Sequence, residues 1–296
     1  MNWLKLGLLY NVKSNGSWRN SHAALPTPLH LKDDVYRIYY STRDVLNHSH
    51  GSFVDIDILT NEIIYESSKP LLSPGSRGLF SDSGITLSCF IPENGVFYYM
   101  GWSLMQKVPF ANHIGGARWD NGILKPMSNM PLITKCEEEP YSFGYPWVLY
   151  RDGLYRVWYD SIMAWHGDTV NHYQCSLRCA ESIDGINWTK NYVDCLDMRK
   201  GERCIARPMV IFEENRYKMW YSINFEGKYS IGYAESYDGI NWIRKDNEVG
   251  ITLSKEGWDS EEIEYPFVFD HKGERYMLYN GNQYGKTGFG IARLIR

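Results

Sequence analysis

A tyrosine-rich hydrophobic segment recurs about every 60 residues along this chain of 296 residues, and the repeat restricts the possible folds more than any other feature. The five copies lie at 36–41, 97–102, 155–160, 217–222 and 275–280. Aromatic and β-branched runs of this length are typical of β-strands. The sequence therefore predicts five copies of one β-rich unit.

The residues around each copy indicate how the unit is built. In three copies an X-Pro step and an apolar run come first, and the tyrosine-rich segment begins nine residues after Pro146, Pro208 or Pro266. Turn-forming residues separate the two runs, as a β-hairpin requires. A third strand follows, and Ser-x-Asp-Gly-x-x-Trp turns at 182–188 and 236–242 lead into a fourth. Four antiparallel strands repeated five times predict an all-β fold, a five-bladed β-propeller.

The ends of the chain predict how the ring closes. We expect blades at about 22–66, 82–127, 141–190, 203–244 and 260–296, and the last of these contains only three strands. The segment 3–12 reads as a strand and would supply the missing fourth one, which removes an exposed sheet edge. Because the repeat runs from end to end, we expect residues 1–296 to form a single domain.

Composition narrows the classes of function. The net charge of −4 gives no electrostatic support for binding nucleic acid. The six cysteines lack zinc-type spacing, and we interpret them as reduced, buried thiols. The N-terminus lacks the pattern of a signal peptide, and no segment is long enough to span a membrane. These features predict a cytoplasmic location.

The histidines gather at one predicted end of the propeller. The start of each first strand and the loop after each second strand lie at the same end. Six of the eight histidines fall there, namely His22, His48, His50, His113, His166 and His172. Loops on a rigid scaffold often carry binding residues, so this clustering favours a site. No H-x-H strand pair or H-E-x-x-H spacing occurs, and we expect neither a catalytic metal nor a cofactor.

The X-Pro steps, the tyrosine-rich strands and the Asp-Gly turns together resemble the five-bladed propeller glycosidases. That superfamily includes family-43 arabinanases and xylosidases, invertase-like enzymes and mannoside phosphorylases, and the resemblance covers essentially the whole chain. It implies a site in the central funnel, with carboxylates at the starts of the first strands. Glu264-Tyr265-Pro266 matches the Glu-x-Pro motif of the general acid. The equivalent positions Gly144 and Ala206 carry no acid, and His22 stands where the family has an aspartate base.

Two carboxylates are the predicted catalytic pair. Cleavage of a glycosidic bond needs a proton donor for the leaving oxygen and a base or nucleophile at the anomeric carbon. We expect Glu264 to be the acid, since burial at the start of an apolar strand would raise its pKa. Asp82 is the expected base or tuning carboxylate. The alternatives are an ion pair between Glu264 and Arg207, and a loop-capping role for Asp82.

Seven other residues are predicted to contact the substrate. The planar fork of Arg207 suits a carboxylate or a phosphate, and His22 suits a sugar hydroxyl or the role of base. Trp165, next to His166 on a long loop, suits stacking on a sugar face. The predicted substrate-binding residues are His22, Arg207, His166, Trp165, Tyr145, Asp160 and Asn280.

The sequence thus predicts a carbohydrate-active enzyme that acts on a glycosidic bond by carboxylate acid/base chemistry. Phosphorolysis and glycosyl transfer use the same fold and stay open as variants of the reaction. The expected partner is a small saccharide, or a nucleotide- or lipid-linked sugar. The alternative from another class is a non-catalytic sugar-binding or scaffold propeller, and the oligomeric state is left open.

Overall fold

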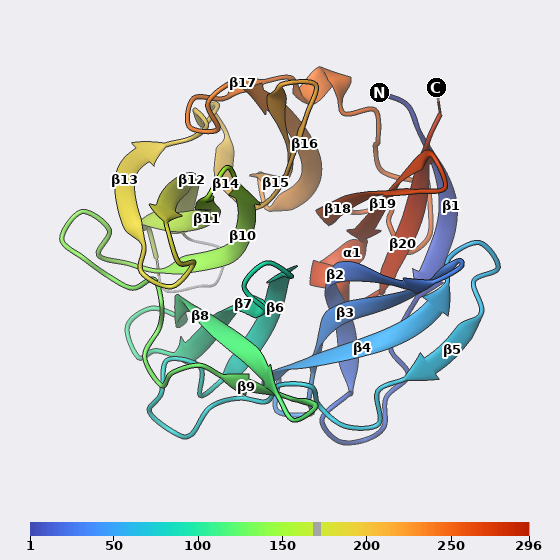
Figure 1. The fold of residues 1–296 in the computed structure, drawn as a ribbon, viewed down its shortest axis with the longest axis horizontal. Coiled ribbons are helices and arrows are strands. Elements are labelled where there is room, and N and C mark those ends of the chain that lie inside the picture. The colour runs from blue at the N-terminus through green and yellow to red at the C-terminus, as the bar shows by residue number, and fades with distance from the viewer. Residues whose placement is uncertain (168–172, 296) are drawn as a thin grey trace.

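The computed structural model describes residues 1–167 and 173–295. Their regular structure is almost all β-strand, and the sheets are arranged as a ring around a centre (Figure 1). Each sheet unit contains four antiparallel strands. The units are β2 (Ser21–Lys32) to β5 (Ile63–Glu66), β6 (Gly84–Ile91) to β9 (Ile123–Pro126), β10 (Phe143–Arg151) to β13 (Thr189–Asp194), β14 (Glu202–Glu213) to β17 (Ile243–Arg244), and β18 (Glu264–His271) to β20 (Phe289–Leu294) with β1 (Trp3–Tyr10).

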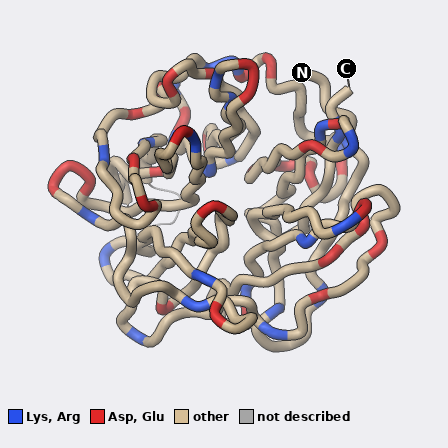
Figure 2. The backbone as a smooth tube through the Cα atoms, viewed as in Figure 1, with Lys and Arg blue, Asp and Glu red and all other residues tan. Residues whose placement is uncertain are grey.

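The second and third strands of these units are β20, bounded above, and β3 (Val35–Arg43), β4 (Ser49–Asp57), β7 (Val96–Leu104), β8 (Phe110–Asp120), β11 (Leu154–Trp165), β12 (Tyr173–Ser182), β15 (Arg216–Phe225), β16 (Lys228–Ser236) and β19 (Glu274–Asn280). A 3₁₀ turn, η1 (Asp246–Glu248), and a short helix, α1 (Asn282–Gly285), complete the described elements. None of the described helices is long and apolar enough to span a membrane. Basic and acidic residues are interspersed around the ring (Figure 2).

The predicted β-hairpins are confirmed, and their turns show why the sequence forms them. The pair Asp152-Gly153 has positive φ at both residues, as do Glu214-Asn215 and Lys272-Gly273. Two consecutive residues with positive φ match the twist of the flanking antiparallel strands. In each case the turn joins the first strand of a unit to the tyrosine-rich second strand.

The predicted role of the N-terminal strand is also confirmed. β1 pairs antiparallel with β20, from Trp3 opposite Leu294 to Tyr10 opposite Phe289, and completes the sheet that contains β18 and β19. The strand ends at Tyr10, two residues earlier than expected. Lys5 on β1 adds an ion pair with Asp259, at 2.7 Å.

The first strands of the units enclose the centre of the molecule. They contact one another in the cyclic order β2, β6, β10, β14, β18 and back to β2. Single parallel bridges link two pairs of neighbouring units, at Ser49–Gly84 and at Cys175–Cys204. The side chains of five strands therefore converge on one axis.

The cysteine prediction was wrong for one pair. Cys175 on β12 and Cys204 on β14 form a disulfide that joins neighbouring units, and both residues are buried. The two strands are parallel neighbours at this one residue pair, which brings the sulfur atoms together. The other four cysteines, Cys89, Cys136, Cys179 and Cys195, are free thiols, as predicted.

Deleting residues 1–12 should destabilise the ring. The deletion removes the strand that covers β20 and leaves an unpaired edge, which is a template for association with another chain. We expect a lower melting temperature, or oligomers in size-exclusion chromatography. A truncated chain that melts as the full-length protein does and remains in the same oligomeric state would contradict the closing role of β1.

Replacing both disulfide cysteines by serine should lower the free energy of unfolding by about 2–4 kcal/mol, because the bond restricts the unfolded chain. The measurement is denaturant unfolding with and without a reducing agent. Reductant should destabilise the natural protein but not the Cys175→Ser/Cys204→Ser variant. Cys136→Ser, which alters a half-buried free thiol, is the matched control. If the natural protein and the Cys175→Ser/Cys204→Ser variant were equally stable under oxidising conditions, the bond would be ruled out.

Candidate functional site

Bulges in three successive first strands determine which side chains face the centre. Tyr145, Arg207 and Tyr265 each precede a proline, and each has φ between 45° and 55°. At each of them the pairing with the second strand shifts register. Proline cannot donate a ladder hydrogen bond and so is confined to edges and bulges, and a bulge can re-aim a side chain. The hydroxyls of Tyr145 and Tyr265 consequently meet, 3.0 Å apart, although their strands are separated by β14.

Glu264, directly before this bulge on β18, is fully buried (0% exposed). Neither of its carboxyl oxygens has a hydrogen-bond partner among the described residues. Burial raises the pKa of Glu264 well above its ordinary value, and the neighbouring charge of Glu262 raises it further, against smaller opposing effects of the Tyr284 backbone N–H and the Tyr265 hydroxyl. The direction of this shift favours the protonated form of Glu264.

Asp160 occupies a related position on β11. It pairs with Gly144, the residue before the bulge of β10, just as Asn280 pairs with Glu264 on β18. A Cβ atom on residue 144 would lie 2.9 Å from Oδ1 of Asp160, so glycine makes room for this carboxyl. Asp160 is 5% exposed, and Oδ1 has no hydrogen-bond partner in the described part of the chain. Burial raises its pKa to about 7.

A group of tyrosines connects the two carboxyls. Burial is the largest cause of the raised pKa values of Tyr145 and Tyr173, and the charges of Glu264 and Asp160 raise both values further. Tyr173 on β12 and Tyr229 on β16 come from third strands, and Tyr284 comes from α1, where its ring contacts that of Tyr229. We call Glu264, Asp160 and the tyrosines 145, 173, 229, 265 and 284 the carboxylate chamber.

Two small residues of β14 and β15 lie at the same level of the ring. Ala206 and Ser222 pair with each other at the positions equivalent to Gly144–Asp160 and Glu264–Asn280. The unit between the two acidic ones therefore contributes little side-chain volume at this level. This spacing leaves the tyrosines as the main contacts of both carboxyls.

Asp82 lies in the loop before β6 and is tied to that loop. It accepts hydrogen bonds from the backbone N–H of Gly78 and the hydroxyl of Ser83. Burial alone would raise the pKa of Asp82, but these hydrogen bonds outweigh it and place the pKa below its ordinary value. Asp82 is thus an ionised loop cap, and its contacts do not include the chamber residues.

His22 lies on β2 in a bulged segment, with φ of 63°. Its Nδ1 and the hydroxyl of Ser21 are 2.8 Å apart. Burial, together with the positive charges of Arg43 and Lys286, lowers the pKa of His22 to about 3. The imidazole is neutral at ordinary pH and is suited to hydrogen bonding rather than to general-base catalysis.

The other predicted residues separate into two groups. Asn280 is fully used inside the protein: its amide donates to Ala23 and Gly288 carbonyls and accepts from the N–H of Leu25, so we leave it out of the site. Trp165 packs against Phe110 and against Tyr173 of the chamber. His166 is exposed next to it. His172, from the predicted histidine cluster, lies outside the described residues.

The ion pair between Glu264 and Arg207, the alternative considered from the sequence, is not observed. Among the described residues no ion pair joins Arg207 to Glu264 or to any other carboxylate. Arg207 is 0% exposed and lies over the ring of Trp147, 5.5 Å from its centroid. Its position before the bulge of β14 is equivalent to that of Tyr145 on β10 and of Tyr265 on β18.

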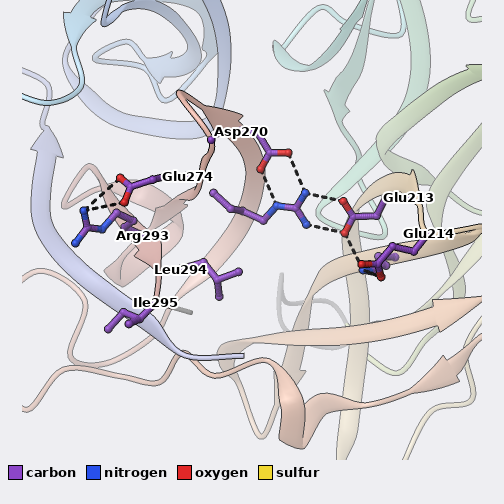
Figure 3. A pocket seen from close by; sticks show the side chains of 10 residues that line it. Glu213, Glu214, Asp270, Glu274, Arg293, Leu294 and Ile295 are labelled. Carbon is purple, nitrogen blue, oxygen red and sulfur yellow. Dashed lines mark hydrogen bonds and ion pairs between the residues drawn. The ribbon is translucent and has the colours of Figure 1, made fainter.

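A cavity of about 690 Å³ lies away from the chamber, between the hairpins of the last two units (Figure 3). Its charged groups neutralise one another: Arg275 bridges Asp270 and Glu213, and Arg293 pairs with Glu274. A second cavity, about 210 Å³, lies between first strands and is lined by Thr27, Cys89, Trp147 and Phe267, among others. The described residues include no group of three or more acidic, histidine or cysteine side chains arranged to hold a metal ion.

Comparison with known proteins assigns the chain to a family. No family model matches it. Two uncharacterised proteins of Mycobacterium tuberculosis, Rv1502 and MT1551, are each 38% identical to it over 299 residues, and the match covers 99% of this chain and of theirs. The chain belongs to the family of these mycobacterial proteins.

Solved structures confirm the predicted resemblance at the level of fold. The structure of a glycoside hydrolase has a TM-score of 0.75 at 15% identity and covers 99% of this chain and 92% of that protein. A thermostable family-43 glycoside hydrolase gives 0.66 at 18%, covering 96% and 93%. An endo-arabinase of Bacteroides thetaiotaomicron gives 0.63 at 13%, covering 95% and 96%. The chain therefore shares the fold of these glycoside hydrolases.

Sequence reasoning placed Tyr145 and Asp160 in the site but missed Tyr173, Tyr229 and Tyr284. The last three lie on third strands and on the α1 turn, where no repeated motif distinguishes them. The sequence did contain a signal for the bulges, because a proline within a strand is confined to sheet edges and bulges. That signal would have predicted that the residue before each proline faces the centre.

The Asp160→Asn variant should be more stable than the natural protein at high pH, and the difference should shrink at low pH. The folded state raises the pKa of Asp160 from 3.8 to about 7, so it binds the proton more tightly than the unfolded state does. Its contribution to stability therefore falls as pH rises through this window. We expect Asp160→Asn to exceed the natural protein in unfolding free energy by up to about 4 kcal/mol at pH 8, and by little at pH 4. Denaturant unfolding at both pH values measures this, with the exposed Asp152→Asn as control. A difference independent of pH would show that Asp160 does not titrate while buried.

Proposed function

We propose that the five four-stranded units are the blades of a single-domain, five-bladed β-propeller, with β1 closing the last blade. The cyclic contacts of the first strands support this interpretation, as does the pairing of β1 with β20. The carboxylate chamber then lies on the propeller axis. The resemblance to the propeller glycosidases implies a site in this same central region.

We further propose that the protein acts on a glycosidic bond by acid/base chemistry, with Glu264 as the general acid. The observation that carries this proposal is a fully buried carboxyl, without an ion-pair partner, at the start of a first strand. A carboxylic acid kept protonated at neutral pH can donate its proton to the leaving oxygen as the C–O bond breaks. Glu264 would donate its proton to the leaving oxygen. The proton of the incoming water, phosphate or sugar hydroxyl would then go to the second carboxylate if that group acts as base, or to Glu264 if the second carboxylate acts as nucleophile.

The second carboxylate is proposed to be Asp160, with Asp82 as the alternative. Burial raises the pKa of Asp160 to about 7, and it raises the pKa of Glu264 well above the ordinary value of a glutamate. Two carboxyls whose pKa values differ in this way are suited to the roles of acid and base. Asp160 also shares Tyr145 and Tyr173 with Glu264, whereas Asp82 is held by its own loop.

Sugar contacts are proposed for Trp165, His22 and Tyr145, with His166 at the edge. Trp165 packs on Tyr173, so its free face would stack on a sugar ring next to the chamber. The expected ligand is a small saccharide, which includes nucleotide- or lipid-linked sugars. The cytoplasmic location stays a prediction, and the Cys175–Cys204 bond argues for an oxidising compartment instead.

The second candidate function is sugar binding without catalysis. It is favoured by one observation: Glu264 is 0% exposed, and neither it nor Asp160 lines the two cavities described above. Catalysis would require the chamber to open, most simply by movement of α1, which carries Tyr284 next to Glu264. A protein that binds saccharides but leaves them intact would follow this second function.

The test is activity against a panel of aryl and natural glycosides. Glu264→Gln should lower kcat by about 10²–10⁴-fold with natural leaving groups, because general acid catalysis contributes that much. It should have a much smaller effect with 2,4-dinitrophenyl leaving groups, which depart without a proton. Asp160→Asn should lower kcat for both, and Asp152→Asn, an exposed carboxylate, should not.

The outcomes separate the alternatives. Loss of activity in Asp82→Asn, with activity retained in Asp160→Asn, would make Asp82 the second carboxylate. Equal losses for good and poor leaving groups in Glu264→Gln would remove Glu264 from the role of acid. Saccharide binding without turnover by the natural protein would favour the non-catalytic function.

A further inference from the structure

Arg207 is a buried cation whose hydrogen-bonding capacity is mostly unused. Its guanidinium makes two long hydrogen bonds to backbone carbonyls, from Nη1 to Pro208 at 3.4 Å and from Nη2 to Ser88 at 3.3 Å. The Ser88 carbonyl already accepts from the hydroxyl of Thr27. Nε has no partner among the described residues, although a guanidinium carries five N–H donors.

The surrounding protein does not offset the burial of this charge. Removing a charged group from water is costly unless the charge is paired. The cation–π contact with Trp147 offsets only part of this cost, and no carboxylate pairs with the guanidinium in the described chain. The pKa of Arg207 falls to about 10 for the same reason, with burial as the largest cause. An arginine left in this state is better explained by a ligand than by packing.

Arg207 occupies the same structural position as the two tyrosines. Tyr145, Arg207 and Tyr265 each stand directly before the proline bulge of the neighbouring first strands β10, β14 and β18. The hydroxyls of Tyr145 and Tyr265 lie 3.0 Å apart, and Glu264, the proposed acid, directly precedes Tyr265. Both hydroxyls can donate to a ligand oxygen. A group bound by Arg207 and this pair would lie next to a glycosidic bond held at Glu264.

Further positive charge lies around the chamber. Arg203, four residues before Arg207 on β14, lies 5.7 Å from the ring centroid of Tyr173, and its charge acts on Tyr284. Arg43 and Lys286 lie close enough to His22 to lower its pKa. These cations share the centre with the carboxyls of Glu264, Asp160 and Glu262, and they supply positive charge that an anionic ligand can use.

We propose that the central site takes a saccharide that carries an anionic oxygen group, a carboxylate or a phosphate, which is bound by Arg207 with the hydroxyls of Tyr145 and Tyr265. The planar guanidinium matches both groups by paired hydrogen bonds. This proposal rests on the proposed function for the identity of the ligand as a sugar, and it specifies the class of that sugar. The two possible sources of the anion, an acidic sugar and a phosphorylated one, share the same chemistry.

Binding to the natural protein is the first test, by isothermal titration calorimetry at fixed ionic strength. The probes are D-galactose, D-galacturonate, galactose 1-phosphate and inorganic phosphate. Galactose and galacturonate differ only at C6. We expect at least one anionic sugar to bind about tenfold or more tightly than galactose, as hydrogen bonds to a charged group contribute. Preference for galacturonate would identify a carboxylate, and preference for the sugar phosphate, with competition by inorganic phosphate, would identify a phosphate.

Variants then locate the effect. Arg207→Met should abolish the preference for the anionic sugar, and Arg207→Lys should reduce it, because lysine retains the charge without the planar fork. Tyr265→Phe removes one hydroxyl with little change in volume, and it serves if Arg207→Met does not fold. Arg199→Met, which alters a largely exposed arginine, should keep the preference.

Failure of this proposal can be told from failure of the proposed function. Equal affinity for galactose and the anionic probes, absence of binding by every anionic probe, or a preference that survives in both Arg207→Met and Tyr265→Phe, would each overturn the anion site. Glu264→Gln should still bind the anionic sugar more tightly than galactose, since its change lies at the proposed acid. If hydrolysis depended on Glu264 but the protein bound anionic sugars no more tightly than galactose, the proposed function would stand and the anion site would be ruled out.

Discussion

The proline steps in the first strands are the constraint on which the centre of this molecule depends. A proline has no N–H for the strand ladder and is therefore confined to edges and bulges, and the first strands β10, β14 and β18 bulge beside theirs. The residue before the proline then takes a left-handed conformation, observed at Tyr145, Arg207 and Tyr265. This single backbone requirement brings side chains of three units together at the axis. The chemistry at the centre follows from the identity of those residues, while the ring itself would tolerate others.

The burial of Glu264 and Asp160 is the energetic cost of this arrangement. Each carboxyl has at least one oxygen without a partner among the described residues, and each has a raised pKa. Protein cores avoid such groups unless function retains them. The tyrosines around the two acids supply apolar rings that exclude water, and hydroxyls that a ligand can use. A site built this way keeps poorly solvated charges at the expense of stability, which is the usual relation between an active centre and its fold.

Most of the fold could be predicted from the sequence, because the repeat combines several local signals that agree. The turn pairs such as Asp152-Gly153, the tyrosine-rich strands and the terminal strand all lie as expected. The site could be predicted only in part. Glu264 was found through its motif, but the relation of Asp160 to it depends on Gly144, Ala206 and Ser222, whose only contribution is small size. The disulfide depends on one parallel contact between units, and cysteine spacing along the chain does not contain that information.

The pairing of β1 with β20 has a mechanical consequence. Trp3 lies opposite Leu294, so the two ends of the chain emerge side by side, and Figure 1 shows the N- and C-terminal labels close together. A force that pulls the ends apart would load the hydrogen bonds of this strand pair one after another, starting at the termini, instead of all at once. The ring is therefore weakest against being unzipped at its seam, although the seam is internal to a sheet. The same geometry lets a short linker join the two ends, so that the chain could be opened at another surface turn without loss of the ring.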